Sequence, residues 1–178
     1  MVPDQDTGTQ PLLSVQDLQT YFFTDEGTVK AVDGASFEVH AGKTLGIVGE
    51  SGCGKSITAR SILQIIDRPG QIVGGQVKFS PNGVDGLNLL DLEPNGKEIR
   101  SIRGGEISMI FQEPMTSFSP VHTFGNQIIE AIRLHSSLEQ KEAYDLAVDW
   151  MRRVGIPSPE QRMSEYAYQF SGGQRQRA

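Results

Sequence analysis

A glycine-rich segment, Gly49-Glu50-Ser51-Gly52-Cys53-Gly54-Lys55-Ser56, limits what this chain can fold into more than any other feature. It matches the pattern G-x-x-x-x-G-K-[ST], which acquires meaning only between a strand and a helix. The apolar run from Thr44 to Val48 predicts a short buried strand, and residues 57–66 predict a helix. This order of strand, loop and helix indicates an α/β fold built around a phosphate-binding loop.

The residue types of the loop suit a polyphosphate. Successive backbone N–H groups of a tight loop form a concave anion site, and glycines permit positive φ and close approach. The following helix adds unpaired N–H groups and the positive end of its dipole. Lys55 would reach the β- and γ-phosphates, and the Ser56 hydroxyl would take a Mg²⁺ position. The alternative to a phosphate site is a glycine-rich turn in which the lysine occurs by chance. The predicted strand and helix on either side of the loop disfavour this alternative. The predicted contacts are Gly49, Glu50, Ser51, Gly52, Cys53, Gly54, Lys55, Ser56 and Ile57.

Composition narrows the class of protein. The 178 residues, 37% hydrophobic and 21% charged, suffice for one globular domain. A net charge of −6 gives no basic footprint, so we expect no nucleic-acid partner. Cys53 is the only cysteine, which excludes a disulfide framework and fits a reducing compartment. No apolar run reaches the roughly 18 residues of a membrane span, and no signal-peptide layout is present.

The chain divides into a strand-rich and a helix-rich part. Residues 1–10 predict a loose tail, and short strands are expected at Val15–Phe23, Ala35–Val39 and Val77–Ser80. Turns between these strands predict an antiparallel sheet beside the nucleotide. Residues 89–103 are of mixed character, and Glu106–Phe111 predicts a further buried strand.

The second part predicts two helices. Thr123–Leu134 has apolar residues at helical spacing, and Ser137 with Gln140 predicts the capping box of the next helix. That helix is expected to close at Gly155. Its predicted core face consists of Ala143, Leu146, Ala147, Trp150, Met151 and Val154.

Three separated motifs make the chain resemble the ATPase subunit of ABC transporters. GESGCGKS is similar to the family's Walker A loop, Gln112 in MIFQEP to its Q-loop, and SGGQRQR to its signature motif. The order and spacing of the motifs match as well, and the resemblance covers nearly the whole chain. The stretches AVDGASFEV and ISMIFQEPMTSFSP resemble the subfamily that powers import of dipeptides, oligopeptides or nickel.

The resemblance implies an α/β P-loop NTPase fold of the ABC type. Its parts would be an antiparallel β subdomain with the phosphate-loop core at residues 11–121, a helical subdomain at 122–170 and the signature motif at 171–178. In the family an apolar strand ending in Asp-Glu and a switch histidine follow later. Residues 1–178 stop before them, so we expect a partial ATPase domain, truncated just after the signature, in which the C-terminal half of the core is missing. The full-length protein would be an ATP hydrolase, and residues 1–178 alone would be unstable and hydrolyse ATP weakly or not at all.

The resemblance also assigns roles to single residues. Phe22 lies where the family places an aromatic ring that stacks on adenine, with Tyr21 as the second choice. Gln112 would be the catalytic residue that senses Mg²⁺ and the attacking water. A groove near Met115 to Phe118 would receive a coupling helix from a transmembrane partner.

The signature implies a second ATPase subunit. In the family, two subunits pair head to tail, and each signature closes on the γ-phosphate held by the other's loop. Ser171, Gly172, Gly173 and Gln174 would therefore contact the partner's ATP, each favourable dipole contributing on the order of 1 kcal/mol. Other implied partners are transmembrane permease subunits and, indirectly, a solute-binding protein. The implied location is the cytoplasmic face of the cell membrane, as a peripheral protein.

Other interpretations stay open. The chain could be a non-catalytic nucleotide-binding module, or an ABC ATPase that acts on DNA or ribosomes. The absence of heptads between loop and signature disfavours the DNA class, and the acidic charge disfavours the ribosomal class. Just before the signature, Tyr166-Ala167-Tyr168-Gln169-Phe170 departs from the Tyr-Pro-His-Glu-Leu or Phe typical of peptide importers. The transported solute, its direction, and homodimer versus heterodimer are not determined by the sequence.

Overall fold

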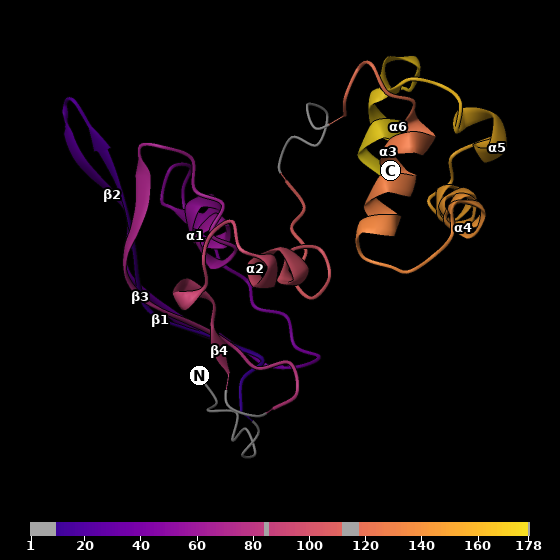
Figure 1. Ribbon diagram of the computed structural model, residues 1–178. Coiled ribbons are helices and arrows are strands. Elements are labelled where there is room, and N and C mark those ends of the chain that lie inside the picture. The colour runs from indigo at the N-terminus through magenta and orange to yellow at the C-terminus, as the bar shows by residue number, and fades with distance from the viewer. Residues whose placement is uncertain (1–9, 84–85, 112–117, 178) are drawn as a thin grey trace. The chain divides into compact units, whose positions relative to one another are not determined.

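The structure, a computed structural model, describes residues 10–83, 86–111 and 118–177 (Figure 1). The chain forms two compact units, Met1–Ile107 and Ser108–Ala178, and each is described by itself. Nine residues of the predicted N-terminal tail, together with Gln112 and Met115, lie outside the described residues.

The first unit is built on a four-stranded antiparallel sheet in the order β2-β1-β3-β4. Its strands are β1 (Leu13–Thr24), β2 (Gly27–Val39), β3 (Gly70–Phe79) and β4 (Leu87–Asn88). The three predicted N-terminal strands are confirmed, and each is longer than expected. Strand β1 lies between β2 and β3, so its backbone forms hydrogen bonds on both edges. Its pairing with β2 continues to Thr24 and Gly27, at the hairpin turn.

Three short helical segments accompany this sheet: α1 (Lys55–Ile62), the 3-10 turn η1 (Leu89–Asp91) and α2 (Lys97–Ile102). They bury one apolar face of the sheet, as Figure 1 lets the reader follow. This first core consists of Val15, Leu18, Val32, Val77, Phe79, Leu89, Leu92, Ile99 and Ile102. Its sheet strands support the loop that precedes α1.

Helix α1 is shorter than the sequence predicted, ending at Ile62 rather than near residue 66. The reason lies two residues further on, where Gln64 adopts a left-handed backbone with φ of 52°. The Gln64 side-chain amide donates hydrogen bonds to the carbonyls of Leu89 and Leu92. These tertiary bonds stabilise a conformation that cannot continue a helix.

The two predicted buried strands at Thr44–Val48 and Glu106–Phe111 are wrong for this structure. Residues 43–50 have no regular secondary structure, and Val48 and Ile110 are 91% and 94% exposed. A strand is stabilised by backbone hydrogen bonds to a neighbour. Within the described residues neither run has a neighbouring strand, apart from one parallel bridge between Arg103 and Ile107.

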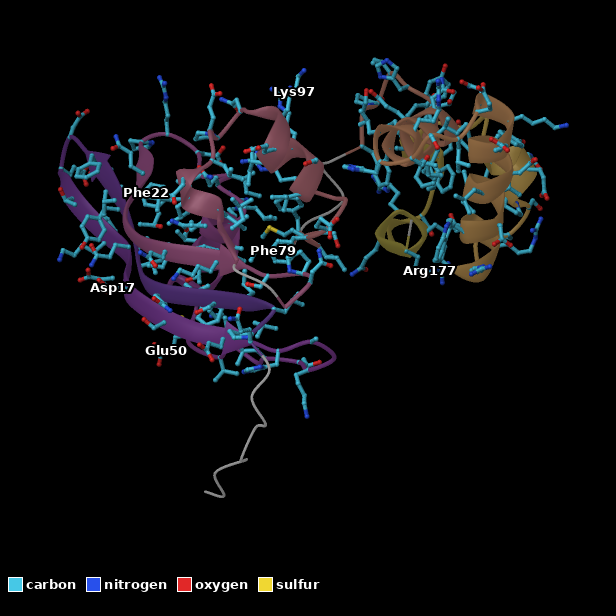
Figure 2. The ribbon with its side chains drawn as sticks, turned by 60° about the horizontal axis from the view of Figure 1, so that its bottom comes forward. Asp17, Phe22, Glu50, Phe79, Lys97 and Arg177 are labelled. Atoms are coloured by element: carbon cyan, nitrogen blue, oxygen red, sulfur yellow. The ribbon has the colours of Figure 1, made fainter. Side chains whose placement is uncertain are left out.

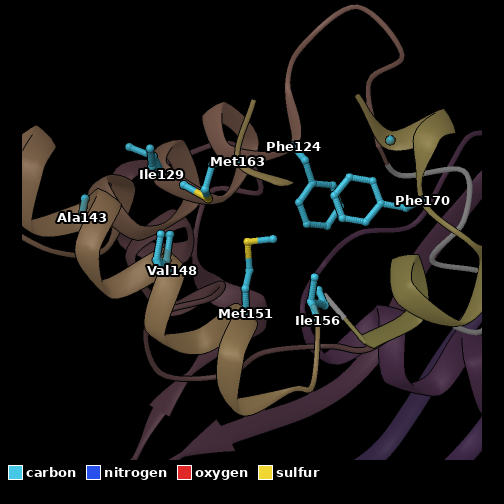
Figure 3. Packing of buried hydrophobic residues seen from close by; sticks show 10 residues of the cluster. Phe124, Ile129, Ala143, Val148, Met151, Ile156, Met163 and Phe170 are labelled. Carbon is cyan, nitrogen blue, oxygen red and sulfur yellow. The ribbon is translucent and has the colours of Figure 1, made fainter. Parts of the chain in front are cut away.

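The second unit is a helical cluster with its own core (Figure 3). Its elements are α3 (Phe124–Leu134), α4 (Gln140–Arg153), α5 (Pro159–Arg162), the 3-10 turn η3 (Ala167–Gln169) and α6 (Gly172–Arg177). The Thr123 side chain caps α3 by accepting a hydrogen bond from the N–H of Asn126, as the predicted helix start requires. No helix in the described ranges is long and apolar enough to cross a membrane.

Three phenylalanine rings organise this second core. The ring of Phe124 lies 4.1 Å from that of Phe170 and 4.9 Å from that of Phe118, measured between centroids. Phe124 and Phe170 are almost fully buried, and Figure 3 shows their rings side by side above Met151 and Ile156. Because Phe170 directly precedes Ser171, this stack fixes the start of the signature segment.

Two predictions about α4 are corrected. The capping box is formed by Glu139 and Glu142 instead of Ser137 and Gln140, and the helix therefore begins at Gln140. Trp150, expected in the core, is 52% exposed at the edge of the helix, where the Arg153 guanidinium lies 5.1 Å from its ring. Val148, absent from the predicted face, is buried in its place.

Candidate nucleotide-binding site

The glycine-rich loop turns directly into α1. Gly54 is the residue before the helix and has φ of 92°, a left-handed conformation that side chains disfavour. The N–H and the hydroxyl of Thr58 donate to the Gly54 carbonyl at 2.8 and 3.0 Å. The N–H groups of Lys55, Ser56 and Ile57 come before that first helical bond, so they have no acceptor inside the helix. The loop therefore ends in backbone donors at the positive end of a helix dipole.

The Lys55 ammonium lies over the loop that precedes it. Its Nζ donates to the carbonyl oxygens of Gly49 at 2.7 Å and Glu50 at 2.6 Å, and lies 3.5 Å from the Cys53 Sγ. The Lys55 side chain thus folds back across the loop, and its positive charge lies next to the loop carbonyls of Gly49 and Glu50. An anionic oxygen is a stronger acceptor for an ammonium than a neutral carbonyl. A phosphate at this position would compete for the same donor.

The loop packs against the sheet through Gly54. A Cβ atom at Gly54 would collide with the backbone carbonyl of Ala31 in β2. Gly49 has no positive φ in this structure, but a Cβ there would lie 2.5 Å from the Cys53 sulfur. Gly52, with φ of 83°, fulfils the expected left-handed conformation. Gly49 and Gly54 are therefore needed because neighbouring atoms leave no room for a Cβ atom. Gly52 and Gly54 are needed because their backbones have positive φ.

A buried hydroxyl pair attaches α1 to β1. The hydroxyls of Thr20 and Ser61 lie 2.7 Å apart, and both residues are fully buried. The Ser61 hydroxyl also donates to the carbonyl of Ile57 at 2.7 Å. Sequence reasoning missed this pair, since no local pattern reveals which hydroxyls meet across a tertiary contact.

Tyr21 and Phe22 have different surroundings. Phe22, labelled in Figure 2, is half-buried. A Cβ atom at Gly70, the first residue of β3, would meet the Phe22 ring and the Ile66 side chain. The Tyr21 hydroxyl instead donates to the Asp33 carboxylate at 2.6 Å, and the Lys30 ammonium lies 5.1 Å from the Tyr21 ring. Consecutive strand residues point to opposite faces, so only one of the two rings can face a given ligand.

The Tyr21 cluster changes three titrations at the surface. The hydrogen bond to Asp33 raises the pKa of Tyr21 above its usual 10.0, and the bond from Tyr21 lowers the pKa of Asp33 below 3.8. The hydrogen bond to Asp33 also raises the pKa of Lys30 above 10.5. Lys30 and Asp33 are exposed and Tyr21 is half-buried, so the cluster lies at the surface of the hairpin.

The signature segment forms the start of helix α6. The Ser171 N–H donates to the Gln174 Oε1 at 2.9 Å, and the Gln174 N–H donates to the Ser171 hydroxyl at 3.4 Å. Ser171, Gly172 and Gly173 are exposed. This turn belongs to the second unit and the phosphate loop to the first.

The predicted Q-loop and groove are covered only in part. Gln112 and residues 115–117 lie outside the described residues, whereas Phe118 is described. Phe118 lines a surface hollow of about 490 Å³ on α3. The other lining residues are Gln127, Ile128, Glu130, Ala131, Ile132 and Leu134.

The metal site predicted from the sequence comprises Ser56 and Gln112, of which Gln112 lies outside the described residues. Ser56 can be placed. Its side chain is exposed at the first turn of α1, where a hydroxyl could reach a cation bound to phosphate oxygens. Within the described part of the chain, no group of three or more His, Cys, Asp or Glu side chains could hold a metal by itself.

Comparison with known proteins agrees with this geometry. The family model described as ABC transporter matches residues 32–178. A probable peptide ABC transporter ATP-binding protein of Sinorhizobium fredii, y4tR, is 48% identical over 168 residues, which are 94% of this chain and 48% of the relative. The dipeptide transport ATP-binding protein DppD of Bacillus subtilis is 44% identical over 169 residues, again 94% of this chain and 48% of the relative.

Solved structures give the same fold. The dimeric structure of MJ0796, a bacterial ABC transporter cassette, superposes with a TM-score of 0.75 at 20% identity, covering 93% of this chain and 66% of that one. A post-hydrolysis state of the same cassette, bound to ADP and Pi, gives a TM-score of 0.76. The present chain spans about half the length of the curated relatives named here. It belongs to the ABC transporter family.

Proposed function

We propose that this chain is the nucleotide-holding part of an ABC transporter ATP-binding subunit whose intact form couples ATP hydrolysis to import of dipeptides or oligopeptides. The observation that carries the proposal is the Lys55 ammonium, folded over the Gly49 and Glu50 carbonyls at the N-terminus of α1. The names of the relatives, which are peptide and dipeptide transport ATP-binding proteins, support the choice of solute.

In this proposal the loop binds the phosphates of Mg-ATP. The N–H groups that begin α1 donate to phosphate oxygens, Lys55 turns from the loop carbonyls to the β- and γ-phosphates, and Ser56 holds Mg²⁺. Phe22 stacks on the adenine, and Gln112 orients the metal and the attacking water. The residues assigned to the loop are Gly49, Glu50, Ser51, Gly52, Cys53, Gly54, Lys55, Ser56 and Ile57.

The other half of the site comes from a second subunit. Ser171, Gly172, Gly173 and Gln174 of that subunit would close on the γ-phosphate, and the exposure of the first three supports this assignment. The structure of the MJ0796 cassette is described as dimeric, which supports pairing of this kind. ATP then stabilises the closed dimer, hydrolysis releases it, and the change in population drives the transporter.

The remaining parts of the proposal concern partners and boundaries. Permease subunits would hold the protein at the cytoplasmic face of the membrane, with a solute-binding protein acting through them. The hollow beside Phe118 is the candidate contact for a permease helix. We assign the β subdomain and phosphate-loop core to residues 11–121, the helical subdomain to 122–170 and the signature to 171–178.

Peptide uptake tests the proposed function. Cells that lack the intact gene are complemented with the wild type, with Lys55→Ala, or with Lys97→Ala as the matched control. Lys97 is an exposed lysine at the start of α2. Uptake of a labelled dipeptide, and ATP turnover by the purified intact protein, should be restored by the wild type and the control but not by Lys55→Ala.

Uptake that is equal for all three proteins would contradict the transport proposal. ATP turnover without any peptide uptake would contradict the proposal that the solute is a peptide. The proposal that the intact protein hydrolyses ATP would still hold. A separate measurement concerns residues 1–178 alone, for which we predict weak or no turnover, because water must be oriented as well as phosphate bound. Turnover by residues 1–178 that Lys55→Ala abolishes would contradict that prediction.

A further inference from the structure

The C-terminal end of α1 is held by Arg103, the residue that directly follows α2. The Arg103 Nε donates to the carbonyl oxygen of Leu63 at 2.7 Å, and its Nη2 donates to that of Gln64 at 2.9 Å. Leu63 is the residue that ends α1. Its carbonyl and the next are at the negative end of the helix dipole, where a cation is favourable.

A guanidinium is suited to this position in a way that an ammonium is not. Its planar fork delivers two parallel N–H bonds to two acceptors, whereas lysine carries a single point charge. Arg103 is half-buried, and burial lowers the pKa of Arg103, with the nearby charge of Arg100 adding to the effect. The group nevertheless stays charged at neutral pH.

The helix held in this way is short and carries the phosphate loop at its other end. The eight residues Lys55–Ile62 span about 12 Å, so a tilt at the C-terminus moves Lys55 directly. The Thr20–Ser61 hydroxyl pair holds the side of α1 near its last turn. The Gln64 side-chain amide adds an attachment just beyond the helix through the carbonyls of Leu89 and Leu92. The two Arg103 bonds differ from both attachments because they are made to backbone carbonyls at the C-terminal end of the helix itself.

Arg103 also belongs to a turn that leads toward the predicted Q-loop. It pairs with Ile107 in a parallel bridge, and the Gly104 N–H donates to the Ile107 carbonyl at 2.8 Å. Gln112 follows Ile107 by five positions in the sequence. The same side chain thus joins the helix behind the phosphate loop to the segment that precedes Gln112.

We propose that Arg103 is a positioning residue for the phosphate loop, fixing the orientation of α1 by its two C-terminal carbonyls and coupling it to the turn at residues 103–107. This inference rests on the proposed ATP binding at Lys55. It predicts that Arg103 affects binding of the phosphates and leaves binding of the adenosine part unchanged.

The test compares variants of the intact protein. Arg103→Met removes the guanidinium group, and Arg103→Lys keeps the positive charge. Arg100→Met is the matched control, since Arg100 is an exposed arginine in α2, close to Arg103 in the sequence. Affinities for ATP and for adenosine are measured on folded protein at low temperature. Hydrogen exchange of residues 103–111 is measured with and without ATP.

We expect Arg103→Met to weaken ATP binding about tenfold, because misplacement of a positioned group by about 1 Å has effects of that order or larger. Arg103→Lys should weaken it by roughly threefold, since one charged contact remains. Adenosine affinity should not change, and Arg100→Met should resemble the wild type. ATP should protect residues 103–111 from exchange in the wild type and fail to do so in Arg103→Met.

Two results would overturn the inference. One is unchanged ATP affinity in a folded Arg103→Met protein. The other is an equal loss of ATP and adenosine affinity with unchanged exchange behaviour, which indicates general destabilisation. If Arg103→Met does not fold, the same criteria apply to Arg103→Lys. Wild-type protein that does not bind ATP would refute the proposed function itself, a result distinct from both.

Discussion

Gly54 is the residue at which the phosphate loop, α1 and β2 meet. Two separate costs oppose any side chain there: a left-handed backbone with φ of 92° and a collision with the Ala31 carbonyl. Gly42 offers a comparison with only the first cost, because it has φ of 70° and no atom near a Cβ. Comparing substitutions at Gly54 and Gly42 therefore separates the cost of backbone strain from the cost of the steric collision.

We predict that Gly54→Ala destabilises the protein more than Gly42→Ala does. The backbone strain costs on the order of 1–2 kcal/mol in either variant. In Gly54→Ala the Ala31 carbonyl must also move, so the loop shifts and ATP affinity falls as well. Urea unfolding of the intact protein and an ATP titration provide the two readouts. Equal destabilisation in both variants would contradict the packing argument.

The Tyr21 cluster gives a prediction about pH. The pKa of Asp33 is lowered in the fold, so its contribution to stability is present above the ordinary pKa of 3.8 and is lost as pH falls through the lowered folded value. The pKa values of Tyr21 and Lys30 are raised, so their contributions are present below 10.0 and 10.5 and are lost as pH rises through the folded values.

Asp33→Asn should therefore bring the pKa of Tyr21 down toward 10.0. The phenolate absorbance of Tyr21 measures this titration, with Tyr21→Phe as the control that identifies its signal among the 4 tyrosines. A Tyr21 titration that is unchanged in Asp33→Asn would show that the hydrogen bond is absent in solution.

The residues of the phosphate loop could be identified from the sequence because they form one continuous motif, Gly49 to Ser56. The left-handed backbones at Gly52 and Gly54 follow from that stretch as well. Thr20, Ser61 and Arg103 could not be predicted, because their partners lie 39 to 41 residues away and the contacts depend on tertiary packing. Local patterns contain no information about such contacts.

Helix α4 shows the same limit for an element. Its helical period was predicted, but its angular orientation was shifted, so that Trp150 is exposed and Val148 is buried. The period follows from sequence spacing, whereas the orientation depends on the rings of Phe124 and Phe170, which come from distant segments. The predicted end of α1 and the predicted strands at Thr44–Val48 and Glu106–Phe111 are wrong for a related reason. Each of these structures depends on a partner elsewhere in the chain.

The orientation of α4 predicts unequal costs for neighbouring side chains. Met151 is 2% exposed, so Met151→Ala should destabilise the second unit by about 2–5 kcal/mol. Trp150 is half exposed, so Trp150→Ala should cost less despite the greater volume removed. Thermal unfolding, followed by circular dichroism, compares the two variants. A larger loss for Trp150→Ala would contradict the orientation of this helix.

For the whole molecule, the two units divide the chemistry. The first unit carries the phosphate loop, and the second carries the signature turn, each supported by its own apolar core. The sequence predicts a strand-rich part followed by a helix-rich part, and the structure contains one unit of each kind.

The central claim is that the Lys55 ammonium binds phosphate oxygens at the start of α1, and calorimetric titration of the intact protein tests it most directly. ATP and adenosine are titrated into the wild type, Lys55→Ala and the control Lys97→Ala. A charge-assisted hydrogen bond contributes roughly 1.5–3 kcal/mol, so Lys55→Ala should weaken ATP binding about 10- to 100-fold and leave adenosine binding unchanged. Equal ATP affinity in the wild type and Lys55→Ala would contradict the account.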